Sequence, residues 1–220
     1  MKSVVLTGLR NKIFSCGGLA ALSATLVLSS TAFGDTVIAK ETVKKTQVCI
    51  PGSGCNISDR NTKLYLSIGI DVSGIPNFSE KMTSQTSFVA RFGPSSDSVS
   101  GFGRQLLDDP NYQEGDTSVV FKSEGKPKVT NLLTWDDATV TYTLIAKGGF
   151  APLTSSKFDL ADGVNNESIF VSLTLEDTDL DELVEKTVPV TIGVKSKTKT
   201  KSDGTETTRK NLSLLAEFAD

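Results

Sequence analysis

Lys63-Leu-Tyr-Leu-Ser-Ile-Gly-Ile-Asp-Val72 is the stretch that decides the fold class. Apolar residues occupy every second position in it: Leu64, Leu66, Ile68, Ile70 and Val72. Because side chains alternate between the two faces of a strand, this spacing gathers all five on one face. The stretch therefore predicts a half-buried β-strand.

The same alternation recurs further along the chain. Residues 168–175 place Ile169, Val171 and Leu173 on one face, and turn formers such as Gly93-Pro94 separate the strand-like segments. We expect further strands at 87–92, 118–122, 129–133, 139–146, 188–199 and 205–218, and short helices at 104–108 and 179–186. This pattern predicts an all-β fold over residues 63–220, an antiparallel β-sandwich of immunoglobulin-like or jelly-roll style. A division into two domains near residue 125 is the alternative.

The end of the chain predicts a long β-hairpin that turns at Ser202-Asp203-Gly204. A two-residue loop would place apolar residues opposite polar ones. A three-residue loop, with Gly204 in the left-handed conformation, instead pairs Val194 with Leu212 and gathers the apolar residues on one face. We expect this loop and the pairs that follow from it: Ile192–Leu214, Val190–Ala216 and Val188–Phe218.

The first 34 residues have the pattern of a secretory signal peptide. A basic start with Lys2, Arg10 and Lys12 precedes an apolar run at 13–28, and Ala32-Phe33-Gly34 fits a cleavage site before Asp35. An uncleaved anchor is the alternative, although the run is short of the roughly 20 apolar residues of a membrane span. We therefore expect an exported protein, which is secreted, periplasmic or on the cell surface.

Residues 35–62 predict an N-terminal arm that carries a disulfide loop. Cys49 and Cys55 are the two cysteines that follow the expected signal peptide, and a turn-rich segment separates them. An even number of cysteines in an exported protein predicts a disulfide. Metal binding or redox chemistry is the alternative, but the spacing is not Cys-x-x-Cys and the chain has no histidine to complete a zinc site.

Composition limits the function classes. The lack of histidine excludes Ser-His-Asp and Cys-His catalysis, and we expect neither an enzyme nor a cofactor. The formal charge of the chain is −3. Residues 1–34 hold three basic and no acidic residues, so residues 35–220 keep 20 basic and 26 acidic residues, a charge of −6. Such an acidic chain is not expected to bind nucleic acid.

The expected hairpin carries the most suggestive charge pattern in the chain. In the chosen register Lys195, Lys197, Lys199 and Lys201 share the face opposite to the apolar one, Arg209 lies opposite Lys197, and Lys210 is nearby. One reading is that lysines on a projecting edge prevent strand-to-strand aggregation. The other is that these six residues bind an anionic polymer or a membrane surface.

Two further patterns are candidate sites. Asp177, Asp179 and Asp181 alternate like the opening of a calcium loop, but the glycine and the closing glutamate of an EF-hand are missing, so a solvated acidic loop is the simpler reading. Trp135 beside Asp136 would suit a carbohydrate platform. A single tryptophan in a β-sandwich is more often a core residue.

The segment Asp108-Asp109-Pro110-Asn111-Tyr112, with Gly115, Thr117-Ser118 and Phe121 after it, forms a DDPxYxxGxTSxxF pattern before paired strands. It resembles a loose set of uncharacterised secreted β-proteins from environmental bacteria. The resemblance covers about a third of the chain. It implies export and an all-β fold, and it brings no assigned activity or catalytic residue.

These patterns lead to two expectations about function. The first is a non-catalytic structural or binding module for an anionic glycan or an envelope surface. The second is a self-assembling envelope or fibre subunit that donates its N-terminal arm as a strand to a neighbouring copy.

Overall fold

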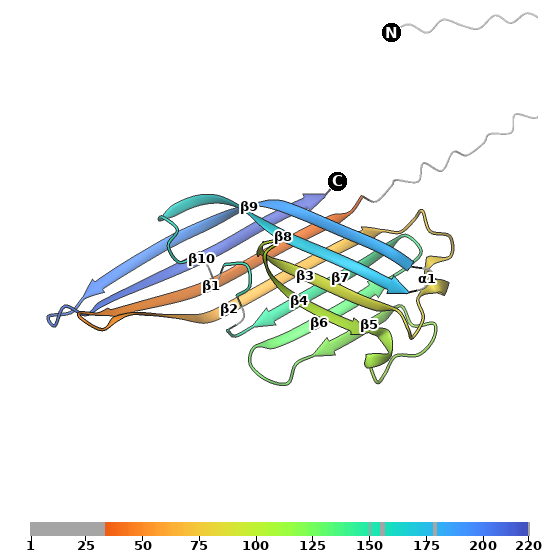
Figure 1. Cartoon of the computed structure of the whole chain (residues 1–220), viewed down its shortest axis with the longest axis horizontal. Helices are drawn as coiled ribbons and strands as arrows, with labels where there is room; N and C mark the ends of the chain where they lie inside the picture. The colour runs from red at the N-terminus through yellow and green to blue at the C-terminus, as the bar shows by residue number, and fades with distance from the viewer. Residues whose placement is uncertain (1–33, 150, 155–156, 178–179, 220) are drawn as a thin grey trace, which may run out of the picture. The chain divides into compact units, whose positions relative to one another are not determined.

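The strands expected from the sequence are present, and most are longer than expected (Figure 1). The structure, a computed structural model, describes residues 34–149, 151–154, 157–177 and 180–219, apart from the side chains of residues 59–61, 181, 183, 218 and 219. The signal peptide expected at residues 1–34 lies outside the described residues except for Gly34. The described elements are β1 (Thr36–Ile50), β2 (Gly54–Asp71), α1 (Phe78–Lys81), β3 (Ser87–Ser95), β4 (Ser98–Gln105), a 3₁₀ turn (Leu106–Asp108), β5 (Ser118–Lys122), β6 (Lys128–Trp135), β7 (Thr139–Lys147), β8 (Gly163–Asp177), β9 (Leu180–Thr200) and β10 (Glu206–Ala219).

All of these strands belong to one antiparallel sheet with the order β4-β3-β8-β9-β10-β1-β2-β7-β6-β5. The predicted all-β antiparallel fold and the C-terminal hairpin are thereby confirmed. The two separate sheets of the expected sandwich are not formed. Instead the single sheet curls into a half-barrel, which brings β8 over β2 across the core. A curled sheet can bury one face of every strand without a second sheet.

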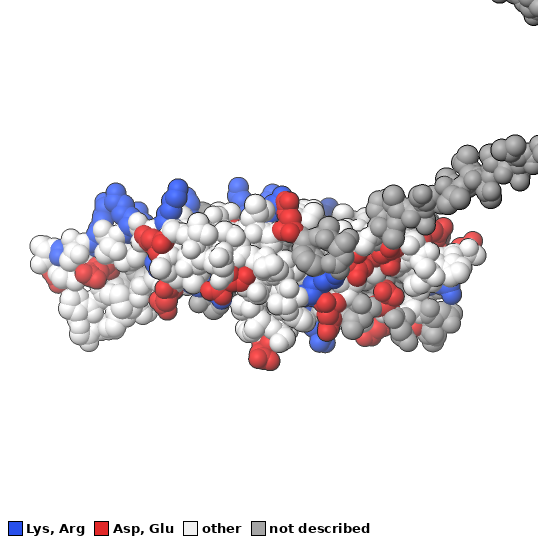
Figure 2. Space-filling view, turned by 90° about the horizontal axis from the view of Figure 1, so that it is seen from above, with Lys and Arg blue, Asp and Glu red and all other residues white. Residues whose placement is uncertain are grey.

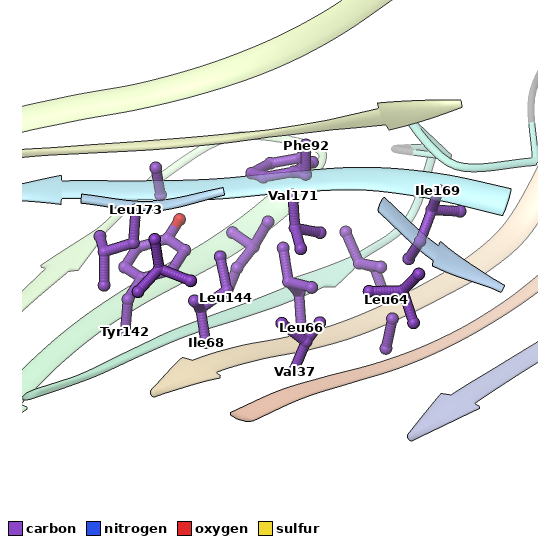
Figure 3. Packing of buried hydrophobic residues seen from close by; sticks show 14 of the residues in the cluster. Val37, Leu64, Leu66, Ile68, Phe92, Tyr142, Leu144, Ile169, Val171 and Leu173 are labelled. Carbon is purple, nitrogen blue, oxygen red and sulfur yellow. The ribbon is translucent and has the colours of Figure 1, made fainter. Parts of the chain in front are cut away.

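The core fills the concave face of the half-barrel. Figure 3 shows Leu66 and Ile68 from β2 pointing toward Val171 and Leu173 from β8. These side chains are buried, as the alternation in the sequence predicted. Removal of their apolar surface from water is the main force that holds the curled sheet together.

The two edge strands of the sheet, β4 and β5, meet through aromatic side chains. Phe102 of β4 lies with its ring centroid 5.9 Å from that of Phe121 of β5, and Phe88 lies 5.9 Å and 6.0 Å from the two. β4 and β5 are not hydrogen-bonded neighbours in the sheet. We call this contact the seam. At the seam the half-barrel is closed by ring packing and not by strand pairing among the described residues.

Residues 35–62, expected as an arm, are built into the middle of the sheet. β1 pairs with β10 on one side and with β2 on the other along almost its whole length. Val37, Ala39 and Val43 are buried, so β1 contributes to the same core as its neighbours. The sequence did not predict this strand because two of its inward residues, Glu41 and Lys45, are charged and buried.

The prediction of a helix at 179–186 is wrong for residues 180–186. They form the start of β9 and pair with β8, for example Val184 with Leu173. Leu180, Val184 and Val188 are spaced by four, which suits one face of a helix and one face of a strand equally well. Pairing with β8 decides between them. Of the helix expected at 104–108, residues 106–108 form a short 3₁₀ turn, whereas Arg104 and Gln105 belong to β4, a strand that was not expected from its glycine-rich sequence.

The two helical elements in the described part of the chain are α1 and this 3₁₀ turn, and no described helix has the length and apolar character needed to cross a membrane.

Candidate anionic-ligand surface

The C-terminal hairpin has the predicted register. Val194 lies opposite Leu212 and Ile192 opposite Leu214, with both pairs buried. At the turn the Lys201 N–H donates to the Thr205 carbonyl at 2.9 Å, and Gly204 has a left-handed φ of +79°. The predicted three-residue loop is confirmed. The described pairing of β9 with β10 runs as far as Thr191 and Leu215, so the predicted pairs Val190–Ala216 and Val188–Phe218 remain predictions.

An Asp side chain fixes the turn itself. The Thr205 N–H donates to Asp203 Oδ1 at 2.8 Å, and this bond holds the pKa of Asp203 below its ordinary value. The carboxylate therefore stays ionised and keeps its turn bond in mildly acidic solution.

The hairpin places four of the predicted cations on its outer face. Lys195, Lys197 and Lys199 of β9 are exposed on the side opposite to the core, and Arg209 of β10 lies directly opposite Lys197. Lys201 is exposed in the loop that follows β9. Like charges that face each other across a strand pair are unfavourable. Their juxtaposition is therefore a feature of this face that the fold tolerates rather than one that stabilises it.

Lys210, one of the six residues predicted to bind an anionic ligand, does not share the outer face. It pairs with Ser196 and Lys45, so its side chain points to the inner face. Its ammonium donates to the Leu160 carbonyl at 2.6 Å and lies 5.2 Å from the centre of the Phe158 ring. Lys210 holds the β7–β8 connection against the sheet and is not part of the outer surface.

Four cations that sequence reasoning missed extend the outer surface. Lys44 of β1 is exposed and lies opposite Asn211, which in turn lies opposite Lys195. In the neighbouring row, Lys63 of β2 pairs with Lys147 of β7, and Lys147 pairs with Lys128 of β6. These residues are far apart in sequence and only the strand register joins them.

We call the resulting surface the basic face and define it by eight outward cations: Lys44, Lys63, Lys128, Lys147, Lys195, Lys197, Lys199 and Arg209. Figure 2 shows Lys and Arg side chains gathered along one border of the outline, most densely toward the end that carries the β9–β10 turn. Among the described residues, none of the eight has a carboxylate partner within salt-bridge distance. Their charge is therefore directed to the solvent.

A shallow groove runs through the basic face. It has a volume of about 660 Å³ and is lined by the outward residues Lys44, Lys195, Lys197 and Arg209 together with Thr46, Thr207 and Asn211. Its lining also includes Val48 and the residues Lys45, Ser196 and Lys210, which belong to the inner parity of their strands. Cations and hydroxyl or amide groups therefore share its lining. Such a lining can form charge-assisted hydrogen bonds to successive anionic groups of an extended ligand.

A row of exposed apolar residues flanks the basic face. Tyr65 of β2 lies between Lys40 of β1 and Ile145 of β7, and Leu215 lies on the other side of Lys40. Tyr65 is 38% exposed and two residues from Lys63 on the same face. Lys40 differs from the eight cations because it forms a salt bridge of 3.0 Å with Glu217.

Trp135 is not available as a carbohydrate platform. It is only 4% exposed and belongs to the core, so its ring cannot stack on a sugar. Asp136 lies in the turn after β6, where Oδ1 accepts from the N–H groups of Ala138 (2.8 Å) and Thr139 (2.7 Å). The pair predicted as a possible carbohydrate site is therefore a core anchor followed by a turn former.

The acidic run does not assemble a metal site in the described residues. Asp177 Oδ2 accepts from the hydroxyls of Thr83 (3.0 Å) and Thr86 (3.1 Å), which ties β8 to the segment before β3. Asp179 and the side chain of Asp181 lie outside the described residues. No three Asp, Glu, His or Cys side chains converge anywhere in the described part of the chain.

The predicted disulfide between Cys49 and Cys55 is confirmed. The two cysteines lie directly opposite each other in β1 and β2, next to the turn that joins these strands. A disulfide indicates an oxidising compartment outside the cytosol.

Comparisons with known proteins leave the family open. No family model and no curated protein matches the chain. A solved structure that it is similar to is Ail, the attachment invasion locus protein of Yersinia pestis, with 8% sequence identity and a TM-score of 0.14, over 84% of this chain and 99% of that chain. A likeness this low carries no argument about this protein.

Proposed function

We propose that this protein is an exported, non-catalytic module that binds an anionic glycan of the cell envelope through the basic face. The observation that carries the proposal is a set of eight outward cations without carboxylate partners in the described residues, on a chain whose net charge is negative. An acidic protein that segregates cations on one face has a local positive potential there. This potential favours an anionic ligand.

The position of the cations in the sheet argues against aggregation control as their sole purpose. Lysines protect a sheet when they lie on an exposed edge strand. Lys195, Lys197 and Lys199 do lie where β9 extends past β8, whose pairing begins at Gly163–Val194. Lys44, Lys63, Lys147 and Arg209, by contrast, are paired with a strand on each side. Edge protection does not explain these four residues, whereas ligand binding does.

The groove and its border favour a glycan over a bare ion. Carboxylates or sulfates spaced along a sugar chain would meet the cations in turn, and sugar hydroxyls would meet Thr46, Thr207 and Asn211. The exposed ring of Tyr65 offers a flat apolar surface beside Lys63 on which a sugar ring can pack.

The test is binding of the purified full chain to polygalacturonate, a carboxylate glycan, in low salt. The double variant Lys197→Gln/Arg209→Gln removes two facing cations, and Lys81→Gln/Arg91→Gln removes two cations away from the basic face. At about 1 kcal/mol for each cation near an anionic surface, the first variant should bind about 30-fold more weakly. The control variant should bind like the unchanged chain.

Equal weakening by both variants would show that only net charge matters and would overturn the proposal. Binding to vesicles that contain phosphatidylglycerol, without binding to polygalacturonate or heparin, would replace the glycan with a membrane surface. The salt dependence of the affinity gives a further check, because contacts made by the cations should weaken as salt screens them.

The donated-strand alternative makes a different demand on the fold. β1 is paired on both sides within its own chain, so assembly through this strand requires one copy to exchange it with another. Light scattering of the purified protein would separate the two ideas. Oligomers that persist in moderate salt favour strand exchange, and a monomer favours the binding module.

A further inference from the structure

A second cavity lies at the seam, where β4 and β5 meet. It has a volume of about 310 Å³, at the lower end of the range for small-molecule sites. Its lining comes from β3, β4, β5, β6 and β7, strands that belong to opposite ends of the sheet order. The curl of the sheet therefore creates a cavity that no short stretch of sequence contains.

The walls of this seam cavity are aromatic and aliphatic. Phe102 and Phe121 stand at the seam, and the buried side chains of Phe92 and Leu144 reach it from deeper in the core. The rings of Phe102 and Phe121 contact each other and do not fill the cavity. An alkyl chain or an aromatic ring is the group that such walls can cover.

One buried polar side chain reaches the cavity from its inner wall. Asn131 of β6 is 3% exposed, and its Oδ1 accepts a hydrogen bond of 2.7 Å from the Tyr142 hydroxyl. Burial raises the pKa of Tyr142, so this hydroxyl keeps its proton and remains a donor. The bond fixes Asn131 and leaves its amide NH₂ as a donor that it can offer to the cavity.

Two cations stand at the seam cavity, and no carboxylate is among the described residues that line it. Arg104 of β4 lies with its guanidinium carbon 5.6 Å from the centre of the Phe102 ring, and Lys122 is the last residue of β5. Both side chains are exposed, and neither has a carboxylate partner in the part of the chain that the structure describes. The planar guanidinium of Arg104 matches the geometry of a carboxylate or a sulfonate.

From this arrangement we propose that the seam cavity binds a small amphipathic anion, a compound with one aromatic or medium-length alkyl group and one carboxylate or sulfonate. The apolar part packs among Phe92, Phe102 and Phe121. The anionic head pairs with Arg104, and Lys122 adds a weaker long-range attraction. The site is separate from the basic face and does not depend on the proposed glycan.

The first test is fluorescence titration of the purified full chain with 1-anilinonaphthalene-8-sulfonate, an aromatic sulfonate that emits strongly in apolar surroundings. We expect saturable binding of one probe per chain. Decanoate should displace the probe, and decanol, which has the same chain without the charge, should displace it at least about tenfold less well, since a charge-assisted bond is lost.

Variants locate the site. Arg104→Gln should weaken probe binding about tenfold or more, and Lys122→Gln should weaken it less. Arg91→Gln, an exposed cation on the neighbouring strand β3, is the matched control and should change nothing, as should Lys197→Gln/Arg209→Gln on the basic face. All of these side chains are exposed, so the variants should fold, and a thermal melt checks this.

Three results would overturn the proposal. The first is probe binding that does not saturate, because this indicates adsorption to many surfaces. The second is equal displacement by decanoate and decanol, which would remove the anionic head from the site. The third is an unchanged affinity in Arg104→Gln, or an equal loss in Arg91→Gln. A loss confined to Lys197→Gln/Arg209→Gln would place the probe on the basic face instead.

Discussion

The two halves of β9 show how one strand serves two regions of this molecule. From Val188 to Val194 every second residue is buried against the curled sheet. From Lys195 to Thr200, beyond the start of β8, both faces are exposed. The half-barrel ends where β9 extends past β8. At that point the sequence changes from alternating buried aliphatic residues to alternating lysines. We call the four-stranded end formed by residues 44–60 and 195–211 the tip.

Under the proposed function, the half-barrel is responsible for stability and the tip for ligand binding. In the half-barrel the side chains are fixed by burial, so substitutions should change the free energy of unfolding. At the tip the outward side chains are solvated, so substitutions of these residues should change binding and leave folding nearly unaltered. Substitutions in the two regions should therefore have different effects.

The largest effect should come from Leu66→Ala in the half-barrel. Leu66 is fully buried between β2 and β8, and such a truncation leaves a cavity. We expect a loss of about 2–5 kcal/mol in the free energy of unfolding, measured by urea denaturation. Thr198→Ala at the tip is the comparison and should stay within about 0.5 kcal/mol. Equal effects at the two positions would break the division.

Two hydrogen bonds, one in the half-barrel and one at the tip, give a second comparison of the two regions. Tyr142→Phe removes the buried donor to Asn131 and leaves its carbonyl oxygen without that partner. We expect a loss of about 1–3 kcal/mol in the same denaturation experiment. At the tip the hydroxyls of Thr198 and Thr208 lie 2.8 Å apart in an exposed pair. Thr208→Val should change stability far less, because water replaces the lost bond.

The disulfide at the tip should have an intermediate effect. Cys49→Ser/Cys55→Ser opens a short ring, and a short ring restricts the unfolded chain only modestly. We expect a loss of about 2 kcal/mol or less. The affinity for polygalacturonate should change little, since neither cysteine belongs to the basic face. A variant that fails to fold would show that the tip stabilises the half-barrel more than this account allows.

Stability should respond weakly to charge on the basic face. Lys197→Gln/Arg209→Gln removes two like charges that face each other. We expect an unchanged or slightly raised free energy of unfolding, by about 0.5 kcal/mol or less, together with the loss of glycan binding. A marked destabilisation would mean that these cations have partners that stabilise the fold.

The smallest effect concerns Glu182 near the start of β9. Partial burial, followed by the charges of Asp35 and Asp71, raises the pKa of Glu182 above its ordinary value. The folded state therefore holds this proton more tightly than the unfolded state, and stability falls as pH rises from the ordinary pKa to the raised one. Glu182→Gln should remove this loss and stabilise the protein at neutral pH by a few tenths of a kcal/mol, roughly the size of exposed charge effects.

The sequence predicted the parts of the fold that depend on local alternation. The β9–β10 register followed from matching buried faces, and it placed Arg209 opposite Lys197 correctly. The central position of β1 did not follow, because its inward face mixes Val37 and Val43 with Glu41 and Lys45. The curling of the sheet could not be predicted from the sequence either. It brings β8 into contact with β2, and these strands are distant in sequence.

The candidate surface was predicted only in part for the same reason. Lys195, Lys197 and Lys199 share one strand, so their alternation is visible in the sequence. Lys44, Lys63 and Lys147 lie on three other strands, β1, β2 and β7. Only the pairing of these strands brings them onto the same face. Lys210 was assigned to the wrong face because it is next to Arg209 in the sequence. Neighbouring residues of a strand point to opposite faces of the sheet.

Lys44 offers the most direct test of the central claim, which is that the basic face binds an anionic glycan. It lies on a strand paired on both sides, so it has no role in protecting an edge. The measurement is the affinity of Lys44→Gln for polygalacturonate in low salt, with light scattering on the same sample. We expect about fivefold weaker binding, from roughly 1 kcal/mol for one cation, by a protein that remains as dispersed as the unchanged chain. An unchanged affinity would contradict glycan binding by the basic face. If the variant also aggregates, the lysines would instead have a role in preventing aggregation.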